Sequence, residues 1–160
     1  MLHRPTQADI DLINDFKNDL RNEEYIKYYE LAYLSFNTRF ETEWCDLQRV
    51  SKNEDGELLG FIFCGINRAH DRVEDIALMN TTKEVNLTFT KDVVGFFDEL
   101  RKKYRKICFD VVVGNPAEKI YDRIIKACNG NIAGIKKKHV RLTDEKFYDF
   151  KSYEIFGKGD

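Results

Sequence analysis

The chain has 160 residues, of which 42% are hydrophobic, and this is enough for one ordinary core but too little for two. We therefore expect a single domain over residues 1–160. The 26 basic and 28 acidic residues give a formal net charge of -2, so no overall field attracts nucleic acid or an anionic membrane. The apolar stretches are far shorter than a membrane span, and the polar N-terminal stretch lacks the apolar core of a secretory signal. These features predict a cytoplasmic protein.

Four cysteines lie far apart in the sequence, at Cys45, Cys64, Cys108 and Cys128. Cys64 and Cys108 fall inside apolar strand patterns. We expect reduced, packed thiols and neither a disulfide framework nor a zinc site. The three histidines lack the spacing of metal ligands, so no metal site is predicted.

Two helical patterns open the chain. Thr6 can cap a helix that carries Ile10, Ile13 and Phe16 at helical spacing. The segment Glu23–Phe36 is also helical in pattern and is rich in tyrosine. Two interpretations stay open for it: a helix packed against a sheet, or a wall of a substrate site, because tyrosine has an apolar body and a polar tip.

The pattern then switches to strands. Apolar runs at Trp44–Val50 and Leu58–Asn67 flank Asp55-Gly56, a strong hairpin signal, and a third strand follows at Val73–Met79. These segments predict an antiparallel meander. Thr88 or Thr90 can then cap a helix that continues to Tyr104.

The next strand, Ile107–Val113, is almost wholly apolar, which predicts a central strand that is buried on both faces. The helix between Val73–Met79 and this strand makes the connection a parallel crossover. Two further strands are expected at Ile132–Leu142 and Phe147–Phe156. The order predicts an α/β (α+β) fold in which helices cover both faces of a mixed, mostly antiparallel sheet.

A well-signalled helix start follows the Ile107–Val113 strand. Gly114 lets the backbone turn, Asn115 is a good N-cap, Pro116 suits the first helical position, and Glu118 can reach back as in a capping box. The free N–H groups of this helix end would face a ligand at the edge of the sheet.

Four segments carry a family resemblance. They are HRPTQADIDLI (residues 3–13), Val73–Leu78, GNPAEKIYDRIIKACNGNIAG (residues 114–134) and DEKFYDFKSYEIF (residues 144–156). In this element order they resemble the GNAT superfamily of acyl-CoA-dependent N-acetyltransferases. The resemblance implies acetyl-CoA as co-substrate and an amine acceptor. The tyrosine-rich early helical segment admits peptides, small amines or aminoglycoside-like polyamines as that acceptor. It also implies that the backbone of Ile76, Ala77 and Leu78 pairs with the pantetheine arm and polarises the thioester carbonyl.

One segment departs from the family pattern. A glycine-rich pyrophosphate loop is expected after Val73–Met79, but Asn80–Thr88 contains no glycine. Lys83, Asn86 and Thr88 could still bind an anion. If Tyr121 is aligned with the family tyrosine, Asn115 falls one place after the usual asparagine.

This departure keeps an alternative open. A GNAT-fold protein that has lost cofactor binding would act as a protein-binding or inhibitory module. A homodimer through the terminal strands is also expected.

Two residues are the catalytic candidates. Tyr121 matches the family position that protonates the leaving thiolate, and the rival interpretation is core packing. Glu74 is the candidate base that takes a proton from the substrate ammonium. Asp75 is the weaker candidate, because neighbouring residues of one strand point to opposite faces and only one can enter a cleft. The basic run Lys136–His139 is typical of a solvated edge strand.

Overall fold

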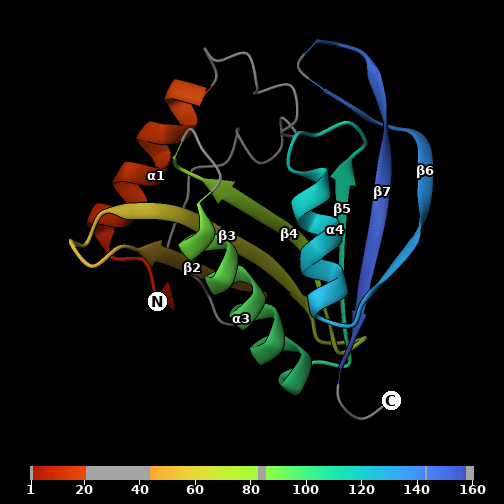
Figure 1. Cartoon of the computed structure of the whole chain (residues 1–160), viewed down its shortest axis with the longest axis horizontal. Coiled ribbons are helices and arrows are strands. Elements are labelled where there is room, and N and C mark those ends of the chain that lie inside the picture. The colour runs from red at the N-terminus through yellow and green to blue at the C-terminus, as the bar shows by residue number, and fades with distance from the viewer. Residues whose placement is uncertain (1, 21–43, 83–85, 143, 158–160) are drawn as a thin grey trace.

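A computed structural model describes residues 2–20, 44–82, 86–142 and 144–157 of the chain (Figure 1). Its seven strands form one sheet in the order β1-β2-β3-β4-β5-β7-β6. The elements are β1 Leu2–His3, α1 Gln7–Leu20, β2 Asp46–Lys52, β3 Leu58–Asn67, β4 Arg72–Asn80, α3 Leu87–Lys103, β5 Lys106–Val112, α4 Glu118–Ala127, β6 Asn131–Arg141 and β7 Phe147–Phe156.

The pairing confirms the predicted fold class. The strands β2, β3 and β4 form the expected antiparallel meander, and β4 pairs with β5 in parallel. Every other neighbouring pair is antiparallel. The aromatic segment Glu23–Phe36 lies outside the described residues. None of the described helices is long and apolar enough to cross a membrane.

Helix α1 begins at the predicted cap. The carboxylate of Asp9 accepts hydrogen bonds from the backbone N–H of Thr6 at 2.9 Å and from its hydroxyl at 2.8 Å, and the Thr6 oxygen accepts the Asp9 N–H. Lys52 of β2 lies 2.7 Å from the same carboxylate. Ile13 packs on a cluster that includes Val50 and Phe61, so α1 covers one face of the β2–β4 half of the sheet.

Helices α3 and α4 pack on the opposite face, where the larger hydrophobic cluster lies (Figure 1). Asn86 caps α3, because its side-chain oxygen accepts the Phe89 N–H at 2.9 Å. The predicted caps Thr88 and Thr90 are wrong: both lie inside the helix, and the Thr90 hydroxyl donates to the Asn86 carbonyl. An asparagine two residues earlier satisfies the free N–H groups equally well.

Helix α4 begins at Glu118, two residues later than predicted. Asn115 accepts the Ala117 N–H at 2.8 Å in a tight turn, which delays the first helical turn. Glu118 reaches back to the Gly114 N–H at 3.0 Å, and Gly114 adopts a φ of 88° that favours glycine. Lys151 of β7 then anchors the helix, with its Nζ 3.0 Å from Glu118 and 2.7 Å from Asp122.

Strand β5 is interior in the sheet, as predicted, but only one of its faces is fully buried. Ile107, Phe109 and Val111 pack against the α3 and α4 cluster. The other face carries Lys106, Cys108 and Asp110, which are half-buried. The expectation of burial on both faces is therefore wrong.

The four cysteines also differ in burial. All four are free thiols, and Cys64 and Cys128 are buried as expected, whereas Cys45 is exposed and Cys108 is only half-buried. At the far edge of the sheet, β6 is exposed almost throughout, including the basic run Lys136–His139, which confirms the solvated edge strand.

Candidate functional site

The sheet opens between β4 and β5. Only Arg72 with Lys106 and Val73 with Ile107 are paired, although both strands continue well beyond these residues. Past Val73 the edge of β4 that faces β5 has no strand partner among the residues that the structure describes, so part of its backbone N–H and C=O groups face the opening.

A β-bulge lies at the point where the strands separate. Phe63 of β3 opposes Ala77 and Gly65 opposes Glu74, so β4 holds one residue more than β3 between these pairs. Asp75 adopts a φ of 53° within the bulge. A side chain at Gly65 would make only ordinary contacts with the Glu74 carbonyl and the Asp75 carboxylate, so the bulge does not depend on a glycine in β3.

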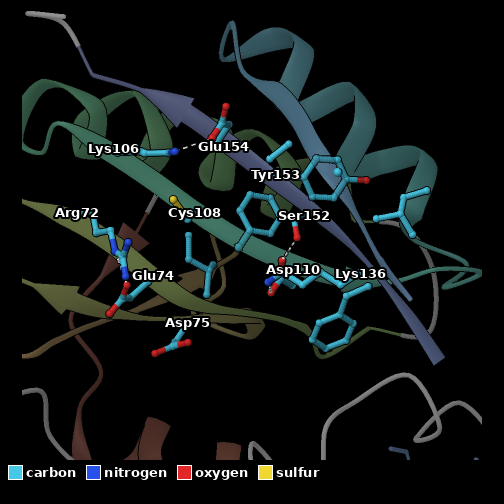
Figure 2. Close-up of a pocket in the computed structure, with 16 residues that line it drawn as sticks. Arg72, Glu74, Asp75, Lys106, Cys108, Asp110, Lys136, Ser152, Tyr153 and Glu154 are labelled. Atoms are coloured by element: carbon cyan, nitrogen blue, oxygen red, sulfur yellow. Dashed lines mark hydrogen bonds and ion pairs between the residues drawn. The ribbon is translucent and has the colours of Figure 1, made fainter. Parts of the chain in front are cut away.

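The bulge overturns the expected alternation of Glu74 and Asp75. Both residues line one cavity of about 590 Å³, because the extra residue and its positive φ interrupt the two-residue period of the strand. Figure 2 shows both carboxylates on β4, across the opening from Asp110 of β5. Strands β6 and β7 supply the remaining walls.

Three ion pairs hold most of the charged side chains of this cavity. The Arg72 guanidinium lies 2.5 Å from Glu74, Lys106 Nζ lies 2.5 Å from Glu154, and Lys136 Nζ lies 2.7 Å from Asp110. Asn67 also donates to Glu74 at 3.0 Å, and the Ser152 hydroxyl donates to Asp110 at 2.5 Å. These pairs fix three of the four cavity carboxylates.

Asp75 is the fourth carboxylate. Within the part of the chain that the structure describes, it has no ion pair and no hydrogen bond, and its side chain faces the cavity (Figure 2). The pKa of Asp75 is raised above the usual aspartate value. Partial desolvation is the largest cause, and the negative charges of Glu74 and Asp110 act in the same direction. A carboxylate in this state is suited to accept a proton.

Tyr121 lies on the other side of β5. Its ring packs on the α3 and α4 cluster and meets the Phe109 ring edge-on, with 6.2 Å between centroids. Phe109 in turn lines the cavity. The two sequence candidates, Glu74 and Tyr121, thus flank β5 from opposite sides.

The residues expected to hold the cofactor lie in β4 or shortly after β4 and β5. Ile76, Ala77 and Leu78 form β4 beyond its last pair with β5. Asn86 and Thr88 lie at the start of α3, where the Asn86 oxygen is already used as the helix cap. Asn115 follows β5, and its side chain is used in the turn before α4. Lys83 lies outside the described residues.

Most of the polar residues that line the cavity were not predicted as site residues. Lys106, Cys108 and Asp110 alternate with apolar residues at the two-residue period of a half-buried strand, and this signal is readable in the sequence. The roles of Asp75 and Glu154 depend on the bulge and on the pairing of β5 with β7. Among the described residues, no group of three or more histidine, cysteine, aspartate or glutamate side chains could hold a metal ion.

The arrangement is similar to solved structures of Vibrio cholerae spermidine N-acetyltransferase. The enzyme in complex with CoA and spermine superposes with a TM-score of 0.75 at 18% sequence identity, covering 98% of this chain and 94% of that chain. A chimera of the Vibrio cholerae enzyme SpeG with hSSAT gives a TM-score of 0.73 at 17% identity, covering 98% and 96%. SpeG with manganese ions gives 0.71 at 17% identity, covering 98% and 91%. No family model and no curated protein matches the sequence. The likeness shows that the predicted GNAT-like fold is correct.

Proposed function

We propose that this protein is an acyl-CoA-dependent N-acetyltransferase that transfers an acetyl group to an amine. The observation that carries the proposal is the opening between β4 and β5, with the Asp75 carboxylate held in its cavity by the bulge. The fold of the solved spermidine N-acetyltransferases supports it, and one of those structures contains CoA.

The residues around the opening fit an acetyl-CoA co-substrate. The unpaired edge of β4 at Ile76–Leu78 offers backbone groups to an extended amide-bearing arm, as a neighbouring strand would. The starts of α3 and α4 follow the carboxyl ends of the parallel strands β4 and β5, which is where open α/β sheets bind ligands. Acetyl-CoA supplies a thioester whose acetyl carbon is open to attack.

Asp75 is assigned the proton-accepting role. A primary amine is an ammonium ion at neutral pH and must lose one proton before its nitrogen can attack. Asp75, directly or through one water, takes that proton, because it has no ion pair among the described residues and its pKa is raised. Glu74 is the weaker candidate, since Arg72 and Asn67 hold its carboxylate.

Transfer then needs a second proton. The nitrogen forms a bond to the acetyl carbon, the carbon–sulfur bond breaks, and the departing thiolate takes a proton. Tyr121 is assigned this donation because it matches the family position and because a phenol is close in basicity to a thiolate. Its ring does not line the cavity itself but packs edge-on against Phe109, which does. The attacking nitrogen loses its second proton as the amide forms, and this proton restores the Tyr121 phenol. The products are the N-acetyl amine, the free thiol and the proton left on Asp75.

Calorimetric titration with acetyl-CoA tests the first half of the proposal. We expect saturable heat in the micromolar range, and no heat at high micromolar concentration would overturn the proposal. Chromatographic detection of CoA released in the presence of primary amines tests the second half, and the Asp75→Asn variant should bind acetyl-CoA normally but release far less CoA.

A second candidate function is a binding or inhibitory module that does not use acetyl-CoA. The observation that favours it is the start of α3, where the Asn86 side chain occupies the Phe89 N–H and the preceding Asn80–Thr88 stretch has no glycine. The same titration decides between the two, because this module would give no heat with acetyl-CoA.

A further inference from the structure

The charge balance of the cavity identifies the class of amine that it accepts. Four carboxylates and three cations line the described walls, and each cation already lies within 2.7 Å of one of the carboxylates. Asp75 is the carboxylate that remains. The described part of the cavity therefore offers one full negative charge to a ligand.

We infer that the acceptor is a monoamine, a primary amine that carries a single positive charge and a polar remainder, and that polyamines are disfavoured. This inference rests on the proposed function and concerns the acceptor side of the same site. It differs from the activity that the names of the solved structures give, which is acetylation of spermidine.

The physical reason is charge balance. Asp75 is exposed at the cavity, so one ammonium can pair with its carboxylate at little desolvation cost. A second or third ammonium would have to displace Arg72, Lys106 or Lys136 from its own carboxylate, and the displaced cation would then repel it. Added charge on the acceptor therefore brings a cost without a matching partner.

The polar remainder follows from the walls. The cavity surface between the ion pairs includes the Ser152 hydroxyl, the half-buried Lys106 side chain and the exposed Lys136 side chain, with exposed fractions of 24% for Lys106 and 47% for Lys136. Hydroxyl and carbonyl groups of an acceptor can bond these donors. The volume of about 590 Å³ suits a small metabolite.

Cys108 provides a readout of binding that does not depend on catalysis. Its thiol lines the cavity between Arg72 and Lys106 (Figure 2), so an occupant should slow its alkylation. The experiment measures alkylation of Cys108 by iodoacetamide, resolved by peptide mass spectrometry, with increasing 4-amino-1-butanol, 1,4-diaminobutane or spermidine. Salt holds the ionic strength constant, and the three amines carry one, two and three positive charges.

We expect 4-amino-1-butanol to protect Cys108 at the lowest concentration and spermidine to require at least about tenfold more, a difference of roughly 1.4 kcal/mol. Protection that strengthens with charge would overturn the inference, as would no protection by any of the three. If acetyl-CoA fails to bind but this order holds, only the proposed function fails. If acetyl-CoA is consumed but spermidine is preferred, only the inference fails.

A charge variant sharpens the test. Lys106→Met keeps the length of the side chain but leaves Glu154 without its cation, so the cavity gains a second free carboxylate. The ratio of 1,4-diaminobutane to 4-amino-1-butanol affinity should rise about tenfold. The matched control is Lys137→Met, which breaks an exposed pair with Asp149 outside the cavity and should leave the ratio unchanged. An equal change in both variants would contradict the inference.

Discussion

The two faces of β5 contact very different surroundings. On one face Ile107, Phe109 and Val111 are buried against α3 and α4, with exposed fractions of 0%, 5% and 7%. On the other face Lys106, Cys108 and Asp110 line a polar cavity. Alternate side chains of one strand therefore have different roles: one set packs in the hydrophobic core, and the other lines the cavity.

The difference shows how this sheet can hold a site without losing its core. The apolar face closes a hydrophobic cluster that continues through the Phe97, Phe109 and Tyr153 rings. The polar face is left open because β4 turns away after Val73. Substitutions on the two faces should therefore change different properties, stability on one and function on the other.

The largest effect is expected from Phe109→Ala. This ring contacts three other aromatic rings in the core, so its removal should cost about 3–5 kcal/mol of unfolding free energy. Urea denaturation measures the loss. Cys108→Ala, one residue away on the cavity face, is the control and should cost less than about 1 kcal/mol. Equal losses would mean that the two faces are not distinct.

Asp75→Asn is expected to have the next largest effect, and on activity alone. Loss of the proton acceptor should lower kcat by about 10²-fold or more, while Glu74→Gln should lower it less. The reverse order of the two variants in a steady-state assay would return the role to Glu74.

The pH dependence of stability gives Asp75 a second test. Because its folded pKa is raised above the usual 3.8, its contribution to stability is present below that value and is lost as pH rises through the folded pKa. At pH 7 the ionised carboxylate is unfavourable, so Asp75→Asn should be as stable as the original protein or slightly more stable. A clear loss of stability at pH 7 would show that Asp75 has a structural partner.

Lys151→Met tests the anchoring of α4 on the core side. Lys151 bridges Glu118 and Asp122, and its side chain is 12% exposed. Its removal should cost about 1–2 kcal/mol at pH 7, less than a fully buried pair because both partners are partly exposed.

Acid should narrow the difference between Lys151→Met and the original protein. The pKa of Glu118 is lowered, chiefly by the hydrogen bond from the Gly114 N–H and also by Lys151. Burial alone would raise the pKa of Asp122, but the hydrogen bonds from Lys151 and Tyr153 outweigh it and lower that pKa. The stability that these carboxylates contribute is present above their unfolded pKa values and is lost as pH falls through the folded ones. A difference that stays constant from pH 7 to pH 3 would contradict this origin.

The sequence predicts the fold better than the site, for a physical reason. Strand and helix periodicity depends on local residues, so the meander, the parallel crossover and the final hairpin are all found near their predicted positions. The helix starts are off by two residues: Asn86 caps α3 in place of Thr88, and α4 begins after Ala117, with no side-chain cap, because Asn115 is used in the preceding turn.

The site depends on a β-bulge and on long-range ion pairs, which sequence periodicity does not predict. The strand period predicts that Glu74 and Asp75 face opposite ways, and a single extra residue in β4 brings both into the cavity. The pairing of Lys106 with Glu154 joins residues of β5 and β7 that are far apart in the sequence. The family resemblance indicates Tyr121 but gives no information on these pairs.

Tyr121→Phe should have the smallest effect. The ring keeps its edge-on contact with Phe109, so stability should fall by no more than about 1 kcal/mol, the usual contribution of one hydrogen bond. If the hydroxyl donates a proton to the thiolate, kcat should fall about tenfold, since water can replace a single donor at modest cost, while KM for the amine stays the same. A rate equal to that of the original protein would assign Tyr121 to the core face of β5 alone, and proton donation would then have to come from solvent.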